Sequence, residues 1–220
     1  MDILFLRHGE SEGNAQGRMQ GRRDFPLSAL GLEQAARAAQ FLGGLGLRLD
    51  AVYASPLLRA RETAQVLCRA VSSELEIEDD LAEIGAGSLE GLNEAEISQR
   101  FPGFMQRPVT KVGDFGEFGG ESYDDVQARV ARVRARLEAR HREQAHRVLL
   151  VGHGGFNFQL LKTLICEPVP RTCIVKMGNC TMTLVRMRVR RERFMGEVVW
   201  HVPVELMGVA AREGASALFT

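Results

Sequence analysis

The chain has 220 residues, 45% of them hydrophobic, which is enough to bury a core in a single enzyme-sized domain. Its 28 lysine and arginine residues are balanced by 28 aspartate and glutamate residues, so the overall charge predicts no nucleic acid partner and no anionic membrane partner. No basic leader precedes the first apolar run, and no segment approaches the roughly 20 apolar residues that span a bilayer, which together predict a cytoplasmic protein.

The first predicted elements are a strand and a helix separated by a loop. The apolar run Ile3–Leu6 predicts a buried strand, and a loop rich in glycine and polar residues follows it as far as Pro26. Apolar residues at helical spacing from 32 to 42 predict the helix, and Ser28 is a suitable N-cap for it.

A second strand and helix follow. The strand is short, over 51–54, and leads into Ser55-Pro56, an N-cap serine followed by a proline at the first helical position. This pair predicts a helix over about 57–72, and a strand-like stretch follows at 75–78. Residues 93–96 have the form of a capping box, which predicts a short helix that ends before Pro102.

Periodicity is lost between residues 101 and 120, where proline, glycine and phenylalanine are frequent. An irregular insertion of this kind is a candidate for a segment that covers a substrate. A surface loop without contact to a substrate is an equally good interpretation.

Val126, Val130, Val133 and Leu137 predict a long helix whose other faces are rich in arginine. A basic helix is compatible with nucleic acid binding. The zero net charge and the interleaved glutamates, such as Glu138, favour a solvated face instead.

An apolar run at 148–151, a helix over about 156–166 and β-rich runs at 173–189 and 194–202 complete the pattern. The alternation of strands and helices predicts an α/β fold, a three-layer α/β/α sandwich with a mainly parallel sheet. We expect one domain over residues 1–205 and a C-terminal tail over 206–220.

Two histidines directly follow predicted buried strands. His8 follows the first strand and His153 follows the strand at 148–151. Because ligands bind in the crevice at the carboxyl ends of parallel strands, the two imidazoles are expected in one site.

The residues near these histidines fit a pocket for phosphate. Arg7 and Arg59 supply guanidinium groups, and Arg59 falls in the first turn of a predicted helix, whose positive end favours an anion. A neutral His8 can act as nucleophile, and two arginines with a protonated second histidine can neutralise the phosphoryl oxygens in place of a metal ion. Ser11 and Asn14 offer short hydrogen-bonding groups to the same pocket.

Glu83 is the best-placed general acid, since it lies between strand-like residues and a glycine-rich turn. No cofactor is expected, because the sequence has no Walker loop, no paired-aspartate motif and no HExxH motif. The cysteines show neither CxxC pairing nor disulfide spacing, which predicts buried thiols and no zinc site. They are Cys68, Cys166, Cys173 and Cys180.

These motifs together resemble the histidine phosphatase superfamily, which has the phosphoglycerate mutase-like fold. The segments that carry the resemblance are Arg7-His8-Gly9 with Glu10, Ser11 and Asn14, then Gln20-Gly21, Pro26–Ser28, Gly31, Ser55–Ala64, Glu83–Leu92, Gly120–Ser122 and Gly152–Gly154. The resemblance implies that His8 is a phosphohistidine nucleophile and Glu83 the proton donor. It further implies that Arg7, Arg59 and His153 hold the phosphoryl oxygens, that Asn14 assists, and that Gln20 and Gly21 contact the substrate.

The stretch after Glu83 separates branches of this family. Cofactor-dependent phosphoglycerate mutases carry arginine, tyrosine and lysine where this chain has Ile84, Ala86 and Glu94. Without these positively charged and hydrogen-bonding side chains, a bisphosphate intermediate is poorly retained in the site, so hydrolysis is favoured over mutase activity. The phosphatase branch usually has tryptophan at the position of Leu89.

The predicted function is therefore a metal-independent phosphatase for small phosphomonoesters. A phosphoglycerate mutase and a non-catalytic phospholigand-binding regulator are the alternatives. The sequence leaves the natural substrate, the formation of a homodimer and the roles of Arg22 and Arg23 open, with solvated loop charges the favoured interpretation of the two arginines.

Overall fold

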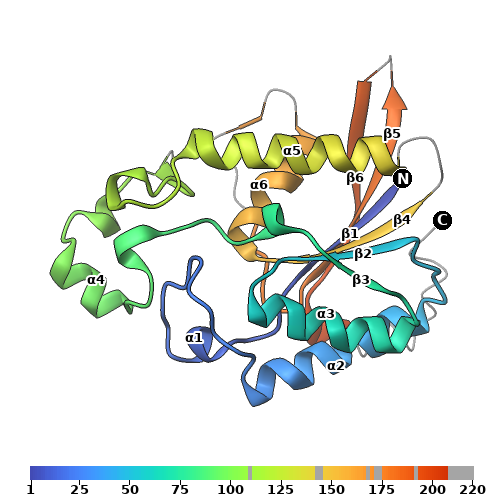
Figure 1. Cartoon of the computed structure of the whole chain (residues 1–220), viewed down its shortest axis with the longest axis horizontal. Coiled ribbons are helices and arrows are strands. Elements are labelled where there is room, and N and C mark those ends of the chain that lie inside the picture. Colours follow the sequence, from blue (N-terminus) through green and yellow to red (C-terminus); the bar gives the residue numbers. More distant parts are fainter. Residues whose placement is uncertain (109–110, 142–145, 167–168, 171–174, 191–192, 208–220) are drawn as a thin grey trace.

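A six-stranded sheet, in the order β3-β2-β4-β1-β5-β6, forms the centre of the molecule (Figure 1). The computed structural model describes residues 1–108, 111–141, 146–166, 169–170, 175–190 and 193–207. The strands are β1 (Asp2–Arg7), β2 (Ala51–Ala54), β3 (Leu75–Ile77), β4 (Arg147–Gly152), β5 (Met182–Arg190) and β6 (Arg193–Val202). The first four are mutually parallel, whereas β5 pairs antiparallel with both β1 and β6.

Helices cover both faces of this sheet. They are α1 (Glu12–Ala15), α2 (Ala29–Gly44), α3 (Leu58–Val71), α4 (Glu94–Arg100), α5 (Tyr123–His141) and α6 (Gly154–Ile165). In Figure 1, α5 runs along one side of the sheet and α2 with α3 along the other. The predicted three-layer α/β/α sandwich with a mainly parallel sheet is confirmed.

The alternation of side chains along β1 explains the two layers. Ile3 and Phe5 pack into the cluster that includes α5 and α6, while Leu4 and Leu6 pack into the cluster that includes α2 and α3. All four are fully buried, and burial of each such side chain stabilises the fold by about 1.5–3 kcal/mol.

Two predicted helix caps are confirmed and one is wrong. The Ser28 Oγ accepts the Gly31 N–H at 3.0 Å, and Asn93 with Glu96 forms the capping box of α4. The Ser55 prediction is wrong, because α3 begins at Leu58 with Leu57 as N-cap, and the Leu57 side chain makes no capping bond. The reason is tertiary, since Asp24 Oδ1 accepts the Leu58 N–H at 2.7 Å, while the Ser55 hydroxyl accepts the Leu57 N–H and lies 2.7 Å from His153 Nε2.

The boundaries of other elements also differ from expectation. The loop before Pro26 contains α1, a four-residue helix with a capping box between Ser11 and Asn14. Helix α6 begins at Gly154, two residues earlier than predicted.

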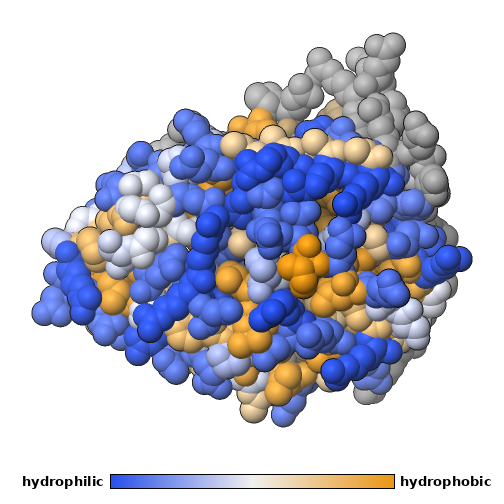
Figure 2. Space-filling model, in the orientation of Figure 1, coloured by the Kyte–Doolittle hydropathy of each residue, from blue (hydrophilic) through white to orange (hydrophobic). Residues whose placement is uncertain are grey.

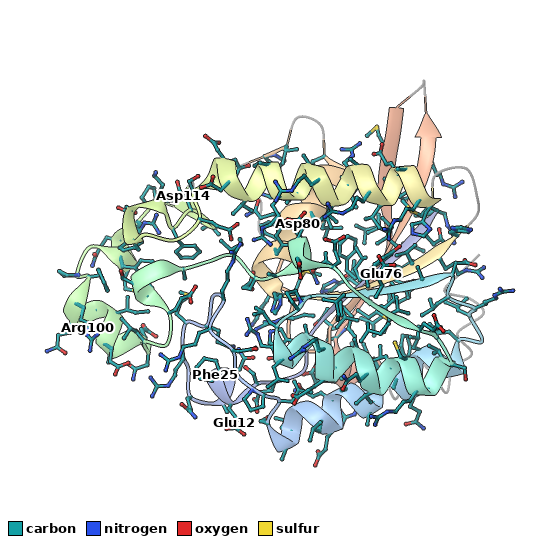
Figure 3. The ribbon with its side chains drawn as sticks, in the orientation of Figure 1. Glu12, Phe25, Glu76, Asp80, Arg100 and Asp114 are labelled. Atoms are coloured by element: carbon teal, nitrogen blue, oxygen red, sulfur yellow. The ribbon has the colours of Figure 1, made fainter. Side chains whose placement is uncertain are left out.

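Within the segment 101–120, the described residues 101–108 and 111–120 are irregular, as predicted, with 3-10 turns at Phe104–Gln106 and Gly116–Phe118. It contacts α4 at the end of the molecule where the parallel strands finish, and Figure 3 shows Arg100 and Asp114 there, far from Glu76 on β3. Its phenylalanines pack together, with the rings of Phe104 and Phe118 5.6 Å apart.

The arginine-rich helix α5 is not simply a solvated face. Arg129 is only 3% exposed, and Arg132 and Arg136 both pair with Asp80. Arg134 pairs with Glu138, one of the interleaved glutamates, at 2.8 Å. The prediction missed the carboxylates that follow β3, because they are distant in sequence.

Cys68 and Cys180 are buried free thiols and Cys166 is partly buried, whereas Cys173 and the tail from 208 onward lie outside the described residues. Burial raises the pKa of the Cys180 thiol to about 12. Among the described helices, none is long and apolar enough to cross a membrane. Figure 2 shows a face on which hydrophobic residues form small areas among hydrophilic ones.

Candidate active site

The sheet brings the two strand-end histidines together. Strands β1 and β4 are parallel neighbours in which Arg7 pairs with Gly152, so His8 and His153 leave the sheet side by side. Their ring centroids lie 5.1 Å apart, and both side chains are buried. The expectation that the two imidazoles share one site is met.

Local contacts fix the tautomer of His8. The Gly9 carbonyl oxygen lies 2.6 Å from Nδ1, and a carbonyl can only accept, so Nδ1 carries the proton. Nε2 is therefore unprotonated, and its lone pair accepts the Arg59 Nε–H at 3.3 Å. Burial, together with the charges of Arg7 and Arg59, holds the His8 pKa well below its usual value. The ring is thus a neutral nucleophile at neutral pH.

The loop after α1 orients Arg59, which is 1% exposed. Its Nη2 donates to the Gly21 carbonyl at 2.9 Å and its Nη1 to the Arg23 carbonyl at 3.0 Å. Gly21 has φ +52°, a conformation that glycine adopts without strain. The backbone of this loop therefore directs the guanidinium toward His8.

Arg7 and His153 each present a buried N–H group with no acceptor among the described residues. Arg7 donates from Nη1 to the Met177 carbonyl at 2.7 Å, while its Nε has no partner. The Ser55 hydroxyl engages His153 Nε2, and a hydroxyl that donates there leaves the ring proton on the unpartnered Nδ1. Because buried polar groups are normally paired, donors of this kind suit an anionic ligand.

The expectation of a protonated second histidine is not met in the unliganded site. Burial, followed by the positive charge of Arg59, lowers the His153 pKa well below its usual value. A neutral His153 still donates one hydrogen bond, and the positive charge of the site comes from the arginines.

Glu83 is held at the N-terminus of α6. Its Oε1 accepts the N–H groups of Ile84 and Phe156, both at 2.9 Å, and its Oε2 accepts that of Gly155 at 3.1 Å. A Cβ on Gly155 would lie 2.8 Å from Glu83 Oε1, so only glycine allows this close approach. The carboxyl group is thereby placed beside the His8 pocket.

A cavity of about 510 Å³ opens over these residues. Of the predicted site residues, it is lined by Arg7, His8, Asn14, Gln20, Gly21, Arg59 and Glu83. Ser11 and His153 lie behind this lining, since both are fully buried and Ser11 bonds to Gln20 at 2.7 Å. The segment 101–120 contributes Phe104, Met105, Val112, Gly113 and Phe115 to the wall.

Arg22 and Arg23 do not line this cavity. Arg22 is half exposed and pairs with Glu121 at 3.2 Å, and the Arg23 guanidinium stacks 5.7 Å from the Phe25 ring centroid. Glu94 and Ile84 do line it, whereas Ala86 and Leu89 are buried in a small cluster of their own.

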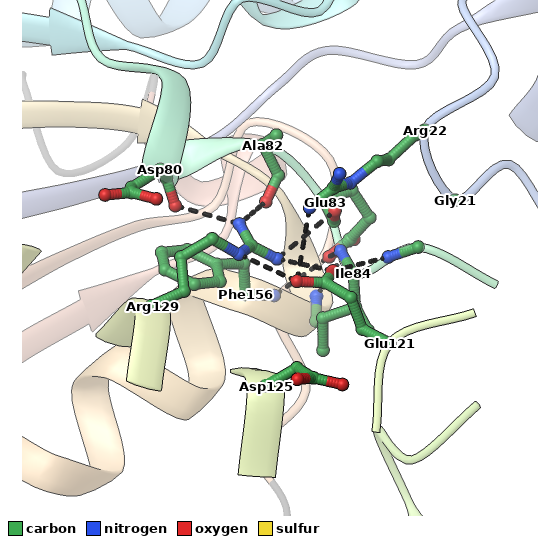
Figure 4. A network of polar contacts seen from close by, with 12 residues as sticks. Gly21, Arg22, Asp80, Ala82, Glu83, Ile84, Glu121, Asp125, Arg129 and Phe156 are labelled. Atoms are coloured by element: carbon green, nitrogen blue, oxygen red, sulfur yellow. Dashed lines mark hydrogen bonds and ion pairs between the residues drawn. The ribbon is translucent and has the colours of Figure 1, made fainter. Parts of the chain in front are cut away.

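A buried ion pair supports the Glu83 segment and was not predicted (Figure 4). Arg129 pairs with Glu121 at 2.8 Å and also donates to the backbone carbonyls of Asp80, Ala82 and Glu83. Glu121 in turn accepts the Gly85 N–H at 2.8 Å. The network therefore fixes the backbone on both sides of Glu83.

Two smaller polar contacts were missed as well. Thr63 Oγ1 accepts the Gly9 N–H at 3.0 Å, and Asn179 Nδ2 donates to the His8 carbonyl at 3.1 Å. Thr63 lies inside the quoted segment Ser55–Ala64, whereas Asn179 carried no local signal. Within the part of the chain that the structure describes, no cluster of three or more histidine, cysteine or acidic side chains is arranged to hold a metal ion.

Comparison with known proteins gives consistent results. A family model for the histidine phosphatase superfamily (branch 1) matches residues 3–197. The bifunctional protein Rv2228c of Mycobacterium tuberculosis is 38% identical over 151 residues, which make up 69% of this chain and 40% of that protein. The chain thus spans less than half the length of that relative.

Two further relatives match over most of their length. A metal-independent phosphoserine phosphatase of Arabidopsis thaliana is 32% identical over 189 residues, covering 85% of this chain and 76% of that protein. The structure of mycobacterial glucosyl-3-phosphoglycerate phosphatase Rv2419c in complex with VO3 has a TM-score of 0.80 at 31% identity, covering 90% of this chain and 96% of that one.

Proposed function

Since the chain belongs to the histidine phosphatase superfamily, branch 1, we propose that it hydrolyses small phosphomonoesters through a phosphohistidine on His8, without a metal ion. The observation that supports this most is the neutral His8 ring beside Arg7 and the buried Arg59, with its Nε2 unprotonated and accepting the Arg59 Nε–H. A nucleophile needs an available lone pair, and a phosphoryl group needs cations around its oxygens.

In the first half-reaction, His8 Nε2 attacks phosphorus and the bond from phosphorus to the ester oxygen breaks. Arg7 and Arg59 neutralise the charge on the non-bridging oxygens, and the Nδ1–H of His153 donates to one of them. Glu83 gives its proton to the leaving oxygen, which departs as an alcohol.

In the second half-reaction, water attacks the phosphohistidine. Glu83, now a carboxylate, takes a proton from this water as the bond between nitrogen and phosphorus breaks. Inorganic phosphate leaves, and His8 returns to its neutral form. The two arginines supply the electrostatic stabilisation that a metal ion supplies in other phosphatases.

The names of the relatives include both activities, since probable phosphoglycerate mutases of Salmonella are among them, so the cavity lining decides between an ester hydrolase and a mutase. Two of the proteins described above are named phosphatases. The distal wall also carries Ile84 and Glu94 where a phosphoglycerate mutase is expected to carry arginine and lysine. Retention of a bisphosphate by this wall is therefore disfavoured.

Phosphate release from a panel of phosphomonoesters in excess chelator tests the proposal. We expect release by the wild type and a loss of at least about 10⁴-fold in His8→Ala, since the nucleophile is removed. His201→Ala is the matched control, because His201 lies on β6 outside the cavity lining. If no ester releases phosphate, the proposal is contradicted, and isomerisation of phosphoglycerate is the next activity to measure.

A further inference from the structure

Apart from the residues around His8, the cavity has a largely apolar wall, although Arg18, Glu94 and Gln159 also line the cavity. The members of this wall come from three parts of the chain: Ile84, Phe115 and Phe158 are at least half-buried, and Phe104, Met105 and Val112 come from the segment 101–120. We propose that the leaving group is an uncharged alcohol with an apolar body, which packs against these six side chains. This inference rests on the proposed function, in that the phosphate is taken to lie at His8.

Part of this wall is exposed to solvent. Met105 is 53% exposed and Val112 45% exposed, although both are large hydrophobic residues. Neighbouring apolar groups exposed along one cavity are a common mark of a ligand-binding surface. A volume of about 510 Å³ is suitable for a small molecule.

The wall is built in advance by a small cluster of its own. The Phe101 and Phe104 rings lie 5.5 Å and 5.6 Å from the Phe118 ring, and the Arg107 guanidinium stacks 5.1 Å from the same ring. Phe115 packs both in this cluster and against the main core. Binding of an apolar group therefore requires little ordering of the wall, which favours affinity.

The charges at the mouth of the cavity disfavour a second anionic group on the substrate. Arg18 is the cation of the distal lining among the described residues, and its guanidinium donates to the Gly91 carbonyl at 2.6 Å and to Gln16 Oε1 at 2.8 Å. Glu94 adds a negative charge to the same wall. A carboxylate or second phosphate at this end would meet apolar groups, Glu94 and an Arg18 guanidinium whose Nε and Nη1 already have acceptors.

Binding of n-alkylphosphonates tests the inference separately from turnover. Titration calorimetry compares ethyl-, butyl- and hexylphosphonate, and also 6-phosphonohexanoate, which places a carboxylate at the far end of a chain matched in length. We expect affinity to rise about two- to fourfold with each added methylene, as partial or full burial of that group predicts. The terminal carboxylate should cancel most of this gain.

Two aspartate variants at exposed positions supply the control. Val112→Asp should reduce the affinity ratio of hexyl- to ethylphosphonate by about tenfold, because it places a charge in the wall. Leu32→Asp changes a residue of similar exposure, 50%, outside the cavity lining, and should leave the ratio unchanged.

The outcomes distinguish the inference from the proposed function. Equal affinity for ethyl- and hexylphosphonate, or tighter binding of 6-phosphonohexanoate than of hexylphosphonate, would overturn the apolar subsite even if esters are hydrolysed. Affinity that rises with chain length in a protein that releases no phosphate would support the subsite and overturn the hydrolysis.

Discussion

Arg7 contributes more to the site than its charge. Its Nη1 is engaged by the Met177 carbonyl, while its buried Nε has no partner among the described residues. A lysine at this position would keep the charge but lose the planar fork and the second donor. On the proposed function, an arginine and not only a positive charge is therefore needed at this position to match the geometry of a phosphoryl group.

Arg7→Lys is accordingly expected to lower kcat by about 10²–10³-fold, a loss typical of the removal of one donor to transition-state charge. Steady-state hydrolysis of a phosphomonoester measures the loss. Arg37→Lys, at an exposed position on α2, is the matched control and should behave as the wild type. Similar kcat values for the two variants would argue against a direct role of Arg7 in the reaction.

At the scale of elements, α5 supports the segment that carries Glu83. The Arg129 side chain is almost fully buried, pairs with Glu121 and donates to three backbone carbonyls. Its guanidinium also lies 4.1 Å from the Phe156 ring centroid at the start of α6. One side chain thus ties α5, α6 and the Glu83 segment together.

Arg129→Met should therefore destabilise the fold by about 3–5 kcal/mol, since it leaves three backbone carbonyls without this donor and removes one charged partner of Glu121, which keeps Arg22 and the Gly85 N–H. Arg132→Met removes the ion pair of a half-exposed arginine with Asp80 and should cost less than about 1 kcal/mol. Urea unfolding of both variants measures the difference. Equal losses of unfolding free energy would show that the Arg129 network stabilises the fold no more than the Arg132–Asp80 ion pair does.

Local signals predicted some elements well and others poorly. Ser28 and Asn93 were read correctly as caps, because a capping hydrogen bond closes within three residues. The Ser55 prediction is wrong because the first N–H group of α3 is accepted by Asp24, 34 positions away in sequence, while the Ser55 hydroxyl contacts His153. The burial of Arg129 was missed for the same reason, since most of its carbonyl partners lie more than 45 positions away.

At the scale of the whole molecule, the sequence predicted the architecture and the identity of the groups around His8, because both follow from strand-end positions and from motifs. The sequence did not predict the contacts that support these groups. Thr63 accepts the Gly9 N–H, and the cavity extends along segment 101–120. Both features depend on tertiary packing, which local sequence patterns do not predict.

Burial of two neutral histidines also gives the fold a dependence on pH. The pKa values of His8 and His153 are held well below the usual value of 6.5. Below that pH the unfolded chain binds more protons than the folded chain, so stability falls as pH falls.

We expect each of the two histidines to remove up to about 2 kcal/mol of stability between pH 6.5 and pH 5. Urea unfolding at the two pH values measures the change, and His8→Asn should show a smaller one. If the wild type and the variant lose stability equally over this range, the buried neutral state of His8 is not supported.

The covalent role of His8 is tested most directly by trapping the intermediate. The protein is mixed with a phosphomonoester, quenched in alkali after milliseconds to seconds, digested and examined by mass spectrometry for a phosphoryl group on a peptide. The account predicts an acid-labile phosphoryl group on the peptide that contains His8, absent from His8→Ala. Phosphate release with no such label, or with the label on another residue, would contradict it.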